Sequence, residues 1–270
     1  GEQADVAIGS ATQGSSEGFD QPDRTLPNGQ DALIAAVADA NPNTIVVLET
    51  GGPVLMPWLG KTAAVVEAWY PGARGAEAIA NVLFGKSNPS GRLPITFPAA
   101  EKQLPREKVD GFDVLEPDFT GNPPHADMAL VANYDIEGSD LGYRWFARKG
   151  EKPLFPFGHG LSYTTFAASG LKTDGATATF TVANTGKRAG ATVAQLYMVT
   201  QAGARRQRLV GYARVDLAAG ASQPVTVAID PRLLADWKNG AWSIAGGDYG
   251  FALGENADTL GPVVTVRMKP

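Results

Sequence analysis

The spacing of apolar residues in the first hundred positions is typical of alternating strands and helices. Short, mostly apolar runs at residues 5–9, 44–48 and 63–69 are predicted to be strands, and the first two are expected to be buried. Apolar residues recur at helical spacing over residues 30–40 and 75–85. Strands that alternate with helices indicate βα units, so this part is predicted to be an α/β domain with an open, mostly parallel sheet.

From about residue 169 the pattern changes to strict alternation of apolar and polar positions. It is clearest over residues 178–184 and 193–199, and shorter runs of the same kind occur at 210–217, 223–229 and 250–253. Short alternating segments separated by turn residues predict an antiparallel β-sandwich. The fold class is therefore α/β followed by all-β.

Three aromatic residues of this second half need a place in the fold. Trp237, Trp242 and Tyr249 are interpreted as filling the sandwich core or capping its ends. A sugar-binding platform built from them is the alternative function.

The segment between the two patterns is rich in proline, glycine and aspartate and is too long for an ordinary connection. Its aromatic density predicts an extended arm packed over the domains, with Tyr143, Arg144 and Trp145 locking it onto the α/β domain by cation–π and packing contacts. The predicted organisation is an α/β domain over 1–98, an arm over 99–168 and a β-sandwich over 169–270.

Composition excludes several classes of function. A net charge of −5 argues against nucleic acid, and the short basic run Arg205-Arg206-Gln-Arg208 is interpreted as a solvated turn. No apolar run is long enough to span a bilayer, so no membrane partner is expected. The chain has no cysteine and two histidines, which leaves little scope for a metal centre, and no cofactor is expected. The lack of cysteine suits the cytosol or the periplasm, and we expect a periplasmic or secreted location; the first residues do not look like a signal peptide.

The acidic residues of the arm are candidate calcium ligands. Asp127, Asp135, Glu137 and Asp140 offer oxygen atoms, but their spacing is not that of an EF-hand. The preferred interpretation is a solvated acidic arm without metal.

Glu17 is the carboxylate best placed for acid/base chemistry. It lies on a loop rich in glycine and serine that follows a predicted strand, and open α/β sheets carry functional groups at that position. The residues alone favour a solvated loop carboxylate. Glu49, at the end of the next predicted strand, is the alternative candidate.

Two neighbours of Glu17 are the candidate substrate-binding residues. Asp20 has a sugar hydroxyl as its possible partner, or else it orients the loop through a local turn. Arg24 has the same candidate role, or else it forms a local ion pair with Asp23.

Three segments, in this order, resemble one known family. They are Ser16-Glu-Gly-Phe-Asp-Gln-Pro-Asp-Arg-Thr-Leu-Pro27, the stretch from Val46 to Pro98 that contains Ala68-Trp-Tyr-Pro-Gly72, and Gly142-Tyr-Arg-Trp145 with Pro153-Leu-Phe-Pro-Phe-Gly-His-Gly-Leu-Ser-Tyr163. Together they resemble the second domain of glycoside hydrolase family 3, of the β-glucosidase type. Two positions depart from the family pattern, Gln21 in place of arginine and His159 in place of tyrosine or phenylalanine.

The resemblance implies a fibronectin type III-like C-terminal domain and a function in carbohydrate metabolism. It implies a retaining β-glycosidase that hydrolyses terminal non-reducing β-linked sugars, with a β-linked oligosaccharide or aryl glucoside as substrate. It also reverses the preference at Glu17, which matches the family's acid/base residue. The family's nucleophile lies on a TIM-barrel domain that this chain lacks, so we expect the chain to be inactive alone.

Two other functions stay open from the sequence. One is a non-catalytic module that binds carbohydrate or protein, and the other is the small subunit of a split glycosidase whose barrel is another polypeptide. A partial sheet also exposes an apolar edge, which predicts dimerisation, poor solubility or a bound partner.

Overall fold

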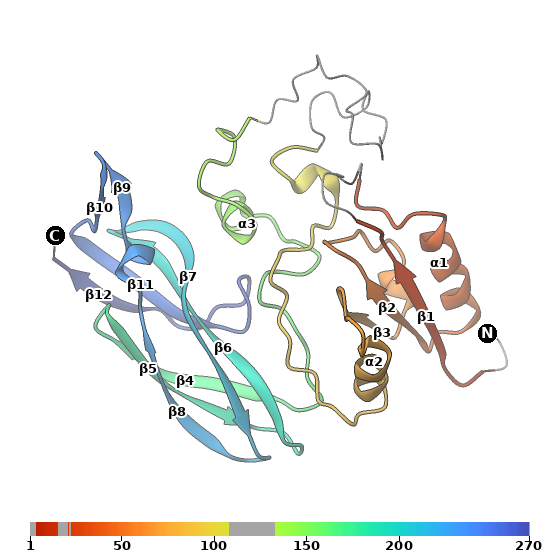
Figure 1. The fold of residues 1–270 in the computed structure, drawn as a ribbon. Helices are drawn as coiled ribbons and strands as arrows, with labels where there is room; N and C mark the ends of the chain where they lie inside the picture. The colour runs from red at the N-terminus through yellow and green to blue at the C-terminus, as the bar shows by residue number, and fades with distance from the viewer. Residues whose placement is uncertain (1–3, 16–20, 22, 108–132, 270) are drawn as a thin grey trace. The chain divides into compact units, whose positions relative to one another are not determined.

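The computed structural model describes residues 4–15, 21, 23–107 and 133–269, and the chain divides into two units (Figure 1). One unit contains the residues up to 80 together with 97–139, and the other contains 81–96 with 140–270. Of the sequence-predicted residues, Glu17, Asp20 and Asp127 lie outside the described parts.

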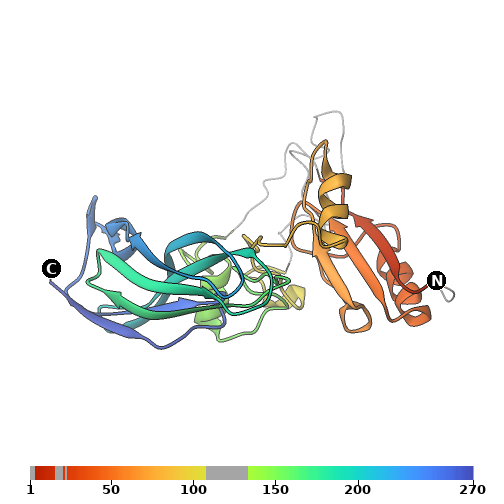
Figure 2. The same ribbon diagram turned by 90° about the horizontal axis from the view of Figure 1, so that it is seen from below.

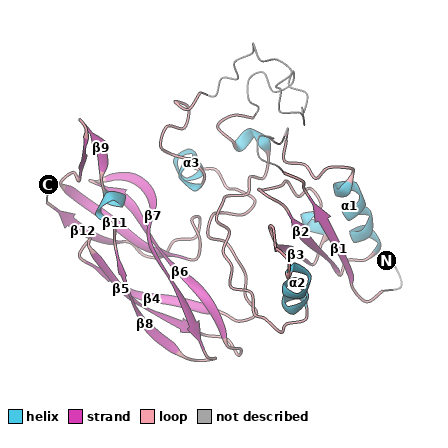
Figure 3. Ribbon diagram, in the orientation of Figure 1, coloured by secondary structure: helices cyan, strands magenta, loops and turns pink. Residues whose placement is uncertain are grey.

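The first unit contains a three-stranded parallel sheet. Its strands β1 (Ala7–Thr12), β2 (Thr44–Glu49) and β3 (Ala64–Glu67) lie in the order β1-β2-β3. The helix α1 (Gln30–Ala40) joins β1 to β2, as Figure 3 shows. The helix α2 (Gly75–Leu83) follows β3, and the short 3₁₀ turns are η1 (Leu59–Lys61) and η2 (Glu101–Gln103). The predicted parallel α/β architecture is confirmed.

Burial differs sharply between the strands of this sheet. The three central residues of β2, Val46, Val47 and Leu48, are fully buried, as a strand with neighbours on both sides requires. The prediction of a buried first strand is wrong, because among the described residues β1 pairs with β2 alone, and Ile8 is half exposed.

The second unit is built around an antiparallel β-sandwich. One sheet has the order β12-β11-β6-β7 and the other the order β4-β5-β8. The strands are β4 (Phe166–Thr173), β5 (Thr177–Asn184), β6 (Gly190–Gln201), β7 (Ala204–Leu217), β8 (Ser222–Ala228), β11 (Gly247–Gly254) and β12 (Val264–Met268). Figure 2 shows the strands of this unit from below. The predicted sandwich is confirmed, and β4 and β12 are additions to the predicted strands.

The aromatic residues of the sandwich divide between core and surface. Tyr249 is fully buried, as predicted. Trp237 and Trp242 are 60% and 55% exposed, so the core interpretation is wrong for both. They face each other across a hairpin of β9 (Asp236–Lys238) and β10 (Ala241–Ser243), which forms a separate two-stranded sheet among the described strands.

The arm carries a short helix, α3 (Tyr143–Lys149), that packs on the sandwich. The ring of Tyr143 stacks on Phe157 at 4.8 Å and meets Tyr197 edge-on, and its hydroxyl accepts a hydrogen bond from the Leu209 amide of β7. The expectation that Tyr143 ties the arm to the α/β domain is therefore wrong. The aromatic rings that Tyr143 packs against, Phe157 and Tyr197, belong to the sandwich unit, and the spacing of residues in the sequence does not reveal these contacts.

The basic run in β7 is also placed differently from expectation. Arg206 pairs with Asp236, and Arg208 is partly buried with its guanidinium donating to the Leu233 carbonyl at 2.6 Å. The run belongs to a strand and not to a solvated turn.

Among the described residues, no helix has the length and apolar character needed to cross a bilayer.

Candidate functional site at the carboxyl edge of the parallel sheet

The three parallel strands of the first unit end at one edge, where their following residues meet. β1 continues into Gln13, whose amide donates to the carbonyl of Glu49 at the end of β2 at 3.2 Å. Thr50, which follows, donates its hydroxyl to the Gly52 carbonyl at 2.8 Å and to the Glu67 carboxylate at 3.3 Å. Because the carboxyl edge is where open α/β sheets place functional groups, this cluster is the candidate site.

The loop that carries Glu17 and Asp20 leaves this edge, and its described stem residues are held in place. Ser15 and Tyr70 are joined by a hydrogen bond between their hydroxyl groups, and Gln21 donates to the Gly14 carbonyl at 2.7 Å. A Cβ atom on Gly51 would collide with both hydroxyl groups. The sequence therefore needs glycine at position 51 for this contact to form.

Arg24, the third candidate residue, has a partner distant in the sequence. Its amide and its guanidinium donate to the two carboxylate oxygens of Glu101 at 2.8 and 2.6 Å. The expected ion pair of Arg24 with Asp23 is not formed. Asp23 instead accepts hydrogen bonds from the amide and hydroxyl of Thr25, which lower the pKa of its carboxyl. Glu101 follows the sheet by many residues, so local sequence could not identify it.

Glu67 is the residue of this site that sequence reasoning missed. Burial raises the pKa of its carboxyl to about 7, against the opposing effect of hydrogen bonds from the Trp69 amide and Thr50. The Trp69 amide is 2.9 Å from Oε1, and Trp69 has a left-handed φ of 53°. The sequence did contain a signal for Glu67, because it is a glutamate at the end of an apolar strand. The same signal makes Glu49 a candidate.

This arrangement can hold a proton near neutral pH and can fix the turn at residues 69–70. A carboxyl with a raised pKa is a frequent property of functional sites, although ion-pair networks also produce it. Glu67 already binds groups of its own turn, so its clearest role is to orient Trp69 and Tyr70, and through Tyr70 the stem of the Glu17 loop.

Two acidic residues of the arm have protein partners, and the interpretation of a solvated acidic arm is wrong for Glu137. Glu137 is fully buried and receives two hydrogen bonds from the Arg106 guanidinium, at 2.7 and 2.6 Å, and Asp140 pairs with Arg148. Within the described ranges no group of three or more histidine or acidic residues could hold a metal ion.

Two family descriptions match the chain. The glycosyl hydrolase family 3 C-terminal domain matches residues 1–163, and the fibronectin type III-like domain matches residues 192–257.

Similar proteins match the chain over most of its length. A β-glucosidase of Rhizobium radiobacter is 38% identical over 278 residues, covering 97% of this chain and 32% of that protein. A probable β-glucosidase I of Aspergillus flavus is 36% identical over 270 residues, covering 92% and 30% respectively.

Solved structures agree with this likeness. DesR, a β-glucosidase from Streptomyces venezuelae in complex with D-glucose, is 44% identical with a TM-score of 0.85, and the match covers 99% of this chain and 34% of that one. A GH3 β-glucosidase of Bifidobacterium adolescentis is 32% identical with a TM-score of 0.82, covering 99% and 39%. The chain thus spans about a third of the length of these relatives.

Proposed function

Because the chain belongs to glycoside hydrolase family 3, as part of its C-terminal region, we propose that it serves a retaining β-glycosidase of the β-glucosidase type. The observation that carries this proposal is the match to the family's C-terminal domain over residues 1–163, which includes the Glu17 loop. The β-glucosidase names of its relatives support a terminal β-linked sugar, in an oligosaccharide or an aryl glucoside, as substrate.

In this proposal Glu17 is the general acid and base. A retaining glycosidase places two carboxyl groups about 5–5.5 Å apart, one to attack the sugar and one to protonate the leaving oxygen. The described stem of the Glu17 loop is held by Ser15 and Gln21 at the carboxyl edge of the sheet, which is a suitable base for a loop that reaches a second domain.

The nucleophile belongs to a barrel domain that we propose as the partner of this region. The chain spans about a third of its relatives, and a single acid/base carboxylate cannot form and break a glycosyl intermediate. We therefore expect no aryl-glucosidase activity from the 270-residue chain alone. Measurable hydrolysis of an aryl β-glucoside by the purified chain would contradict this division of labour.

The decisive experiment compares Glu17→Gln with Asp23→Asn in an enzyme that contains both this chain and its barrel. General acid catalysis contributes about 10²–10⁴-fold, so Glu17→Gln should lower kcat/KM by that factor for a glucoside whose leaving group needs protonation. For a dinitrophenyl glucoside, whose leaving group departs without a proton, kcat/KM should be nearly unchanged. Azide should restore turnover and appear in the product as a glycosyl azide.

Asp23→Asn is the matched control, because Asp23 is on the same loop and its carboxylate is bound by Thr25. In this variant kcat/KM should depend on the leaving group of the substrate in the same way as in the wild type. If Glu17→Gln lowers kcat/KM equally for both glucosides and azide does not restore turnover, Glu17 is not the acid/base residue.

A further inference from the structure

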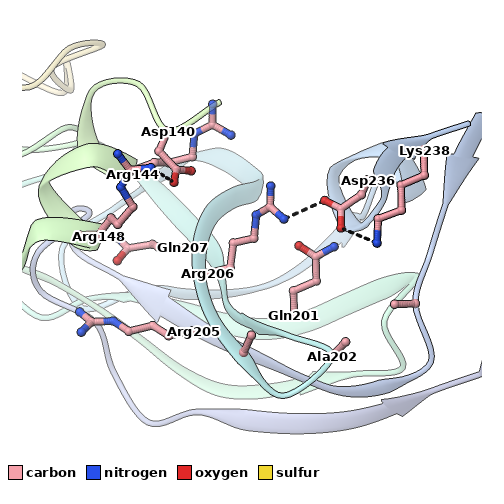
Figure 4. Close-up of a pocket in the computed structure, with 13 residues that line it drawn as sticks. Asp140, Arg144, Arg148, Gln201, Ala202, Arg205, Arg206, Gln207, Asp236 and Lys238 are labelled. Carbon is pink, nitrogen blue, oxygen red and sulfur yellow. Dashed lines mark hydrogen bonds and ion pairs between the residues drawn. The ribbon is translucent and has the colours of Figure 1, made fainter. Parts of the chain in front are cut away.

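A cavity of about 680 Å³ opens in the second unit (Figure 4). It lies between α3, the adjoining ends of β6 and β7, and β9. Its volume is in the range of small-molecule sites, which is roughly 300–1,000 Å³. The proposed glycosidase reaction makes no use of this cavity.

The wall of the cavity carries an excess of positive charge. Five cationic side chains line it, together with two carboxylates: Arg144, Arg148, Arg205, Arg206 and Lys238, with Asp140 and Asp236. The chain as a whole has a net charge of −5, so this surface is opposite in sign to the rest of the molecule. Such a concentration of one sign in a concave site attracts ligands of the opposite charge.

The two carboxylates do not neutralise this excess. Asp236 is 2.7 Å from the Arg206 guanidinium and 3.9 Å from the Lys238 ammonium, so one negative charge is shared between two cations. Asp140 pairs with Arg148 at 3.1 Å. Figure 4 shows these contacts on the two sides of the cavity.

Two cations of the wall are available to a ligand. Arg144 of α3 and Arg205 of β7 form no ion pair among the residues that the structure describes. The neighbouring Arg208 is affected by the positive charge of this wall. Its pKa is lowered first by burial and then by the charges of Arg206 and Arg144, which places these two guanidinium groups close enough to repel a third.

The remainder of the wall is polar and small. Its apolar residues are alanines, such as Ala147 and Ala245, and the amide side chains of Gln201 and Gln207 also line it. A lining without large apolar side chains offers little to a hydrophobic ligand. Amides and guanidinium groups instead suit a ligand that carries both hydroxyl groups and anionic oxygens.

We propose that this cavity binds an acidic oligosaccharide, held through its carboxylates by Arg144 and Arg205 and through its hydroxyl groups by the amides. Guanidinium groups bind carboxylate and phosphate in the same forked geometry. The amide side chains of Gln201 and Gln207 favour a ligand that carries hydroxyl groups beside its carboxylates over inorganic phosphate. The site is independent of the proposed hydrolytic reaction and would add recognition of charged glycans to the sandwich domain.

Isothermal titration of the 270-residue chain with trigalacturonate tests the proposal, with cellotriose and inorganic phosphate as comparison ligands. We expect binding of trigalacturonate that weakens as salt is raised, and no binding of cellotriose. The double variant Arg144→Gln with Arg205→Gln should weaken binding at least tenfold while its thermal unfolding stays that of the wild type.

The matched control is Arg214→Gln with Arg232→Gln, which removes the same charge from exposed arginines of the same unit outside the cavity. Its affinity should stay within about twofold of the wild type, because screened charges at a distance contribute little. The proposal is overturned if trigalacturonate does not bind, if cellotriose binds equally well, or if the control weakens binding as much as the cavity variant. Tighter binding of phosphate at the same arginines would overturn it as well, by identifying a phosphate site.

Discussion

Gly51 occupies a position at which a side chain would not fit without a local change. A Cβ at this position would collide with the hydroxyl groups of Ser15 and Tyr70, which hydrogen-bond to each other. Both groups are at the ends of side chains and can swing away, so Gly51→Ala should cost only that hydrogen bond, about 1 kcal/mol. Urea denaturation measures the loss.

A double-mutant cycle separates this effect from general strain. If the substitution acts through the hydroxyl contact, Tyr70→Phe should destabilise the wild type and add nothing to Gly51→Ala. Gly52→Ala is the control, because a Cβ at that position meets no atom within 4 Å. Additive effects of the two substitutions would contradict the assignment.

Glu67 makes the stability of the first unit depend on pH. Its carboxyl has a pKa raised from 4.5 to about 7, so between these values the folded protein binds more protons than the unfolded chain. The free energy of unfolding must then fall as pH rises from about 4.5 to 7, and the loss is complete above pH 7.

Glu67→Gln should remove this dependence, because a glutamine side chain does not titrate. Its amide oxygen can still accept the hydrogen bond from the Trp69 amide, so the turn is kept. We expect the variant to be more stable than the wild type by about 1–2 kcal/mol at pH 8, after allowance for solvent screening, and equally stable at pH 4. Urea titrations at the two pH values measure the difference. Glu77→Gln, which removes an exposed carboxylate paired with Arg74, is the control. Its stability relative to the wild type should be the same at both pH values.

At the scale of elements, Asn184, the last residue of β5, connects segments at the ends of several strands. This fully buried side chain accepts from the Thr164 hydroxyl and the Gly186 amide, and it donates to the carbonyls of Arg188 and Leu217. Asn184→Ala would leave these buried groups without a partner, which costs about 2–4 kcal/mol. Thermal unfolding of the sandwich should reveal the loss.

The neighbouring Thr185 provides the comparison. Its hydroxyl makes an exposed hydrogen bond with Thr165, so Thr185→Ala should change stability by no more than about 0.5 kcal/mol. Equal effects of the two substitutions would mean that the turn, and not the buried network, carries the stability.

At the scale of the whole molecule, β1 exposes an apolar edge to solvent. Ile8 of β1 and the preceding Val6 are 51% and 48% exposed, and within the described part of the chain β1 pairs on one side. Unpaired strand edges with apolar side chains favour association between copies. Homodimerisation of the 270-residue chain stays a prediction, as does a periplasmic or secreted location.

Ile8→Lys tests the predicted association. Light scattering after size exclusion should show a mass that rises with concentration for the wild type and stays monomeric for the variant. Val263→Lys, at a similarly exposed apolar residue of the other unit, should behave as the wild type. A monomeric wild type at high concentration would contradict the prediction.

The periodic pattern determined the elements that depend on local chemistry. The helix at 30–40, the buried strand predicted at 44–48 and the alternating strands of the sandwich all formed, because an apolar face at the right spacing must be buried. The acid/base role of Glu17, which the family motifs imply, stays a prediction, because Glu17 lies outside the described residues.

Tertiary structure decided which distant residues meet. The partner of Arg24 is Glu101, the helix that begins at Tyr143 packs on the sandwich, and Trp237 is exposed on a hairpin. The pKa of Glu67 and the cationic cavity depend in the same way on burial and on groups brought together by folding. Sequence periodicity specifies which face of an element is buried, but not which other element covers it, and electrostatics depends on the latter.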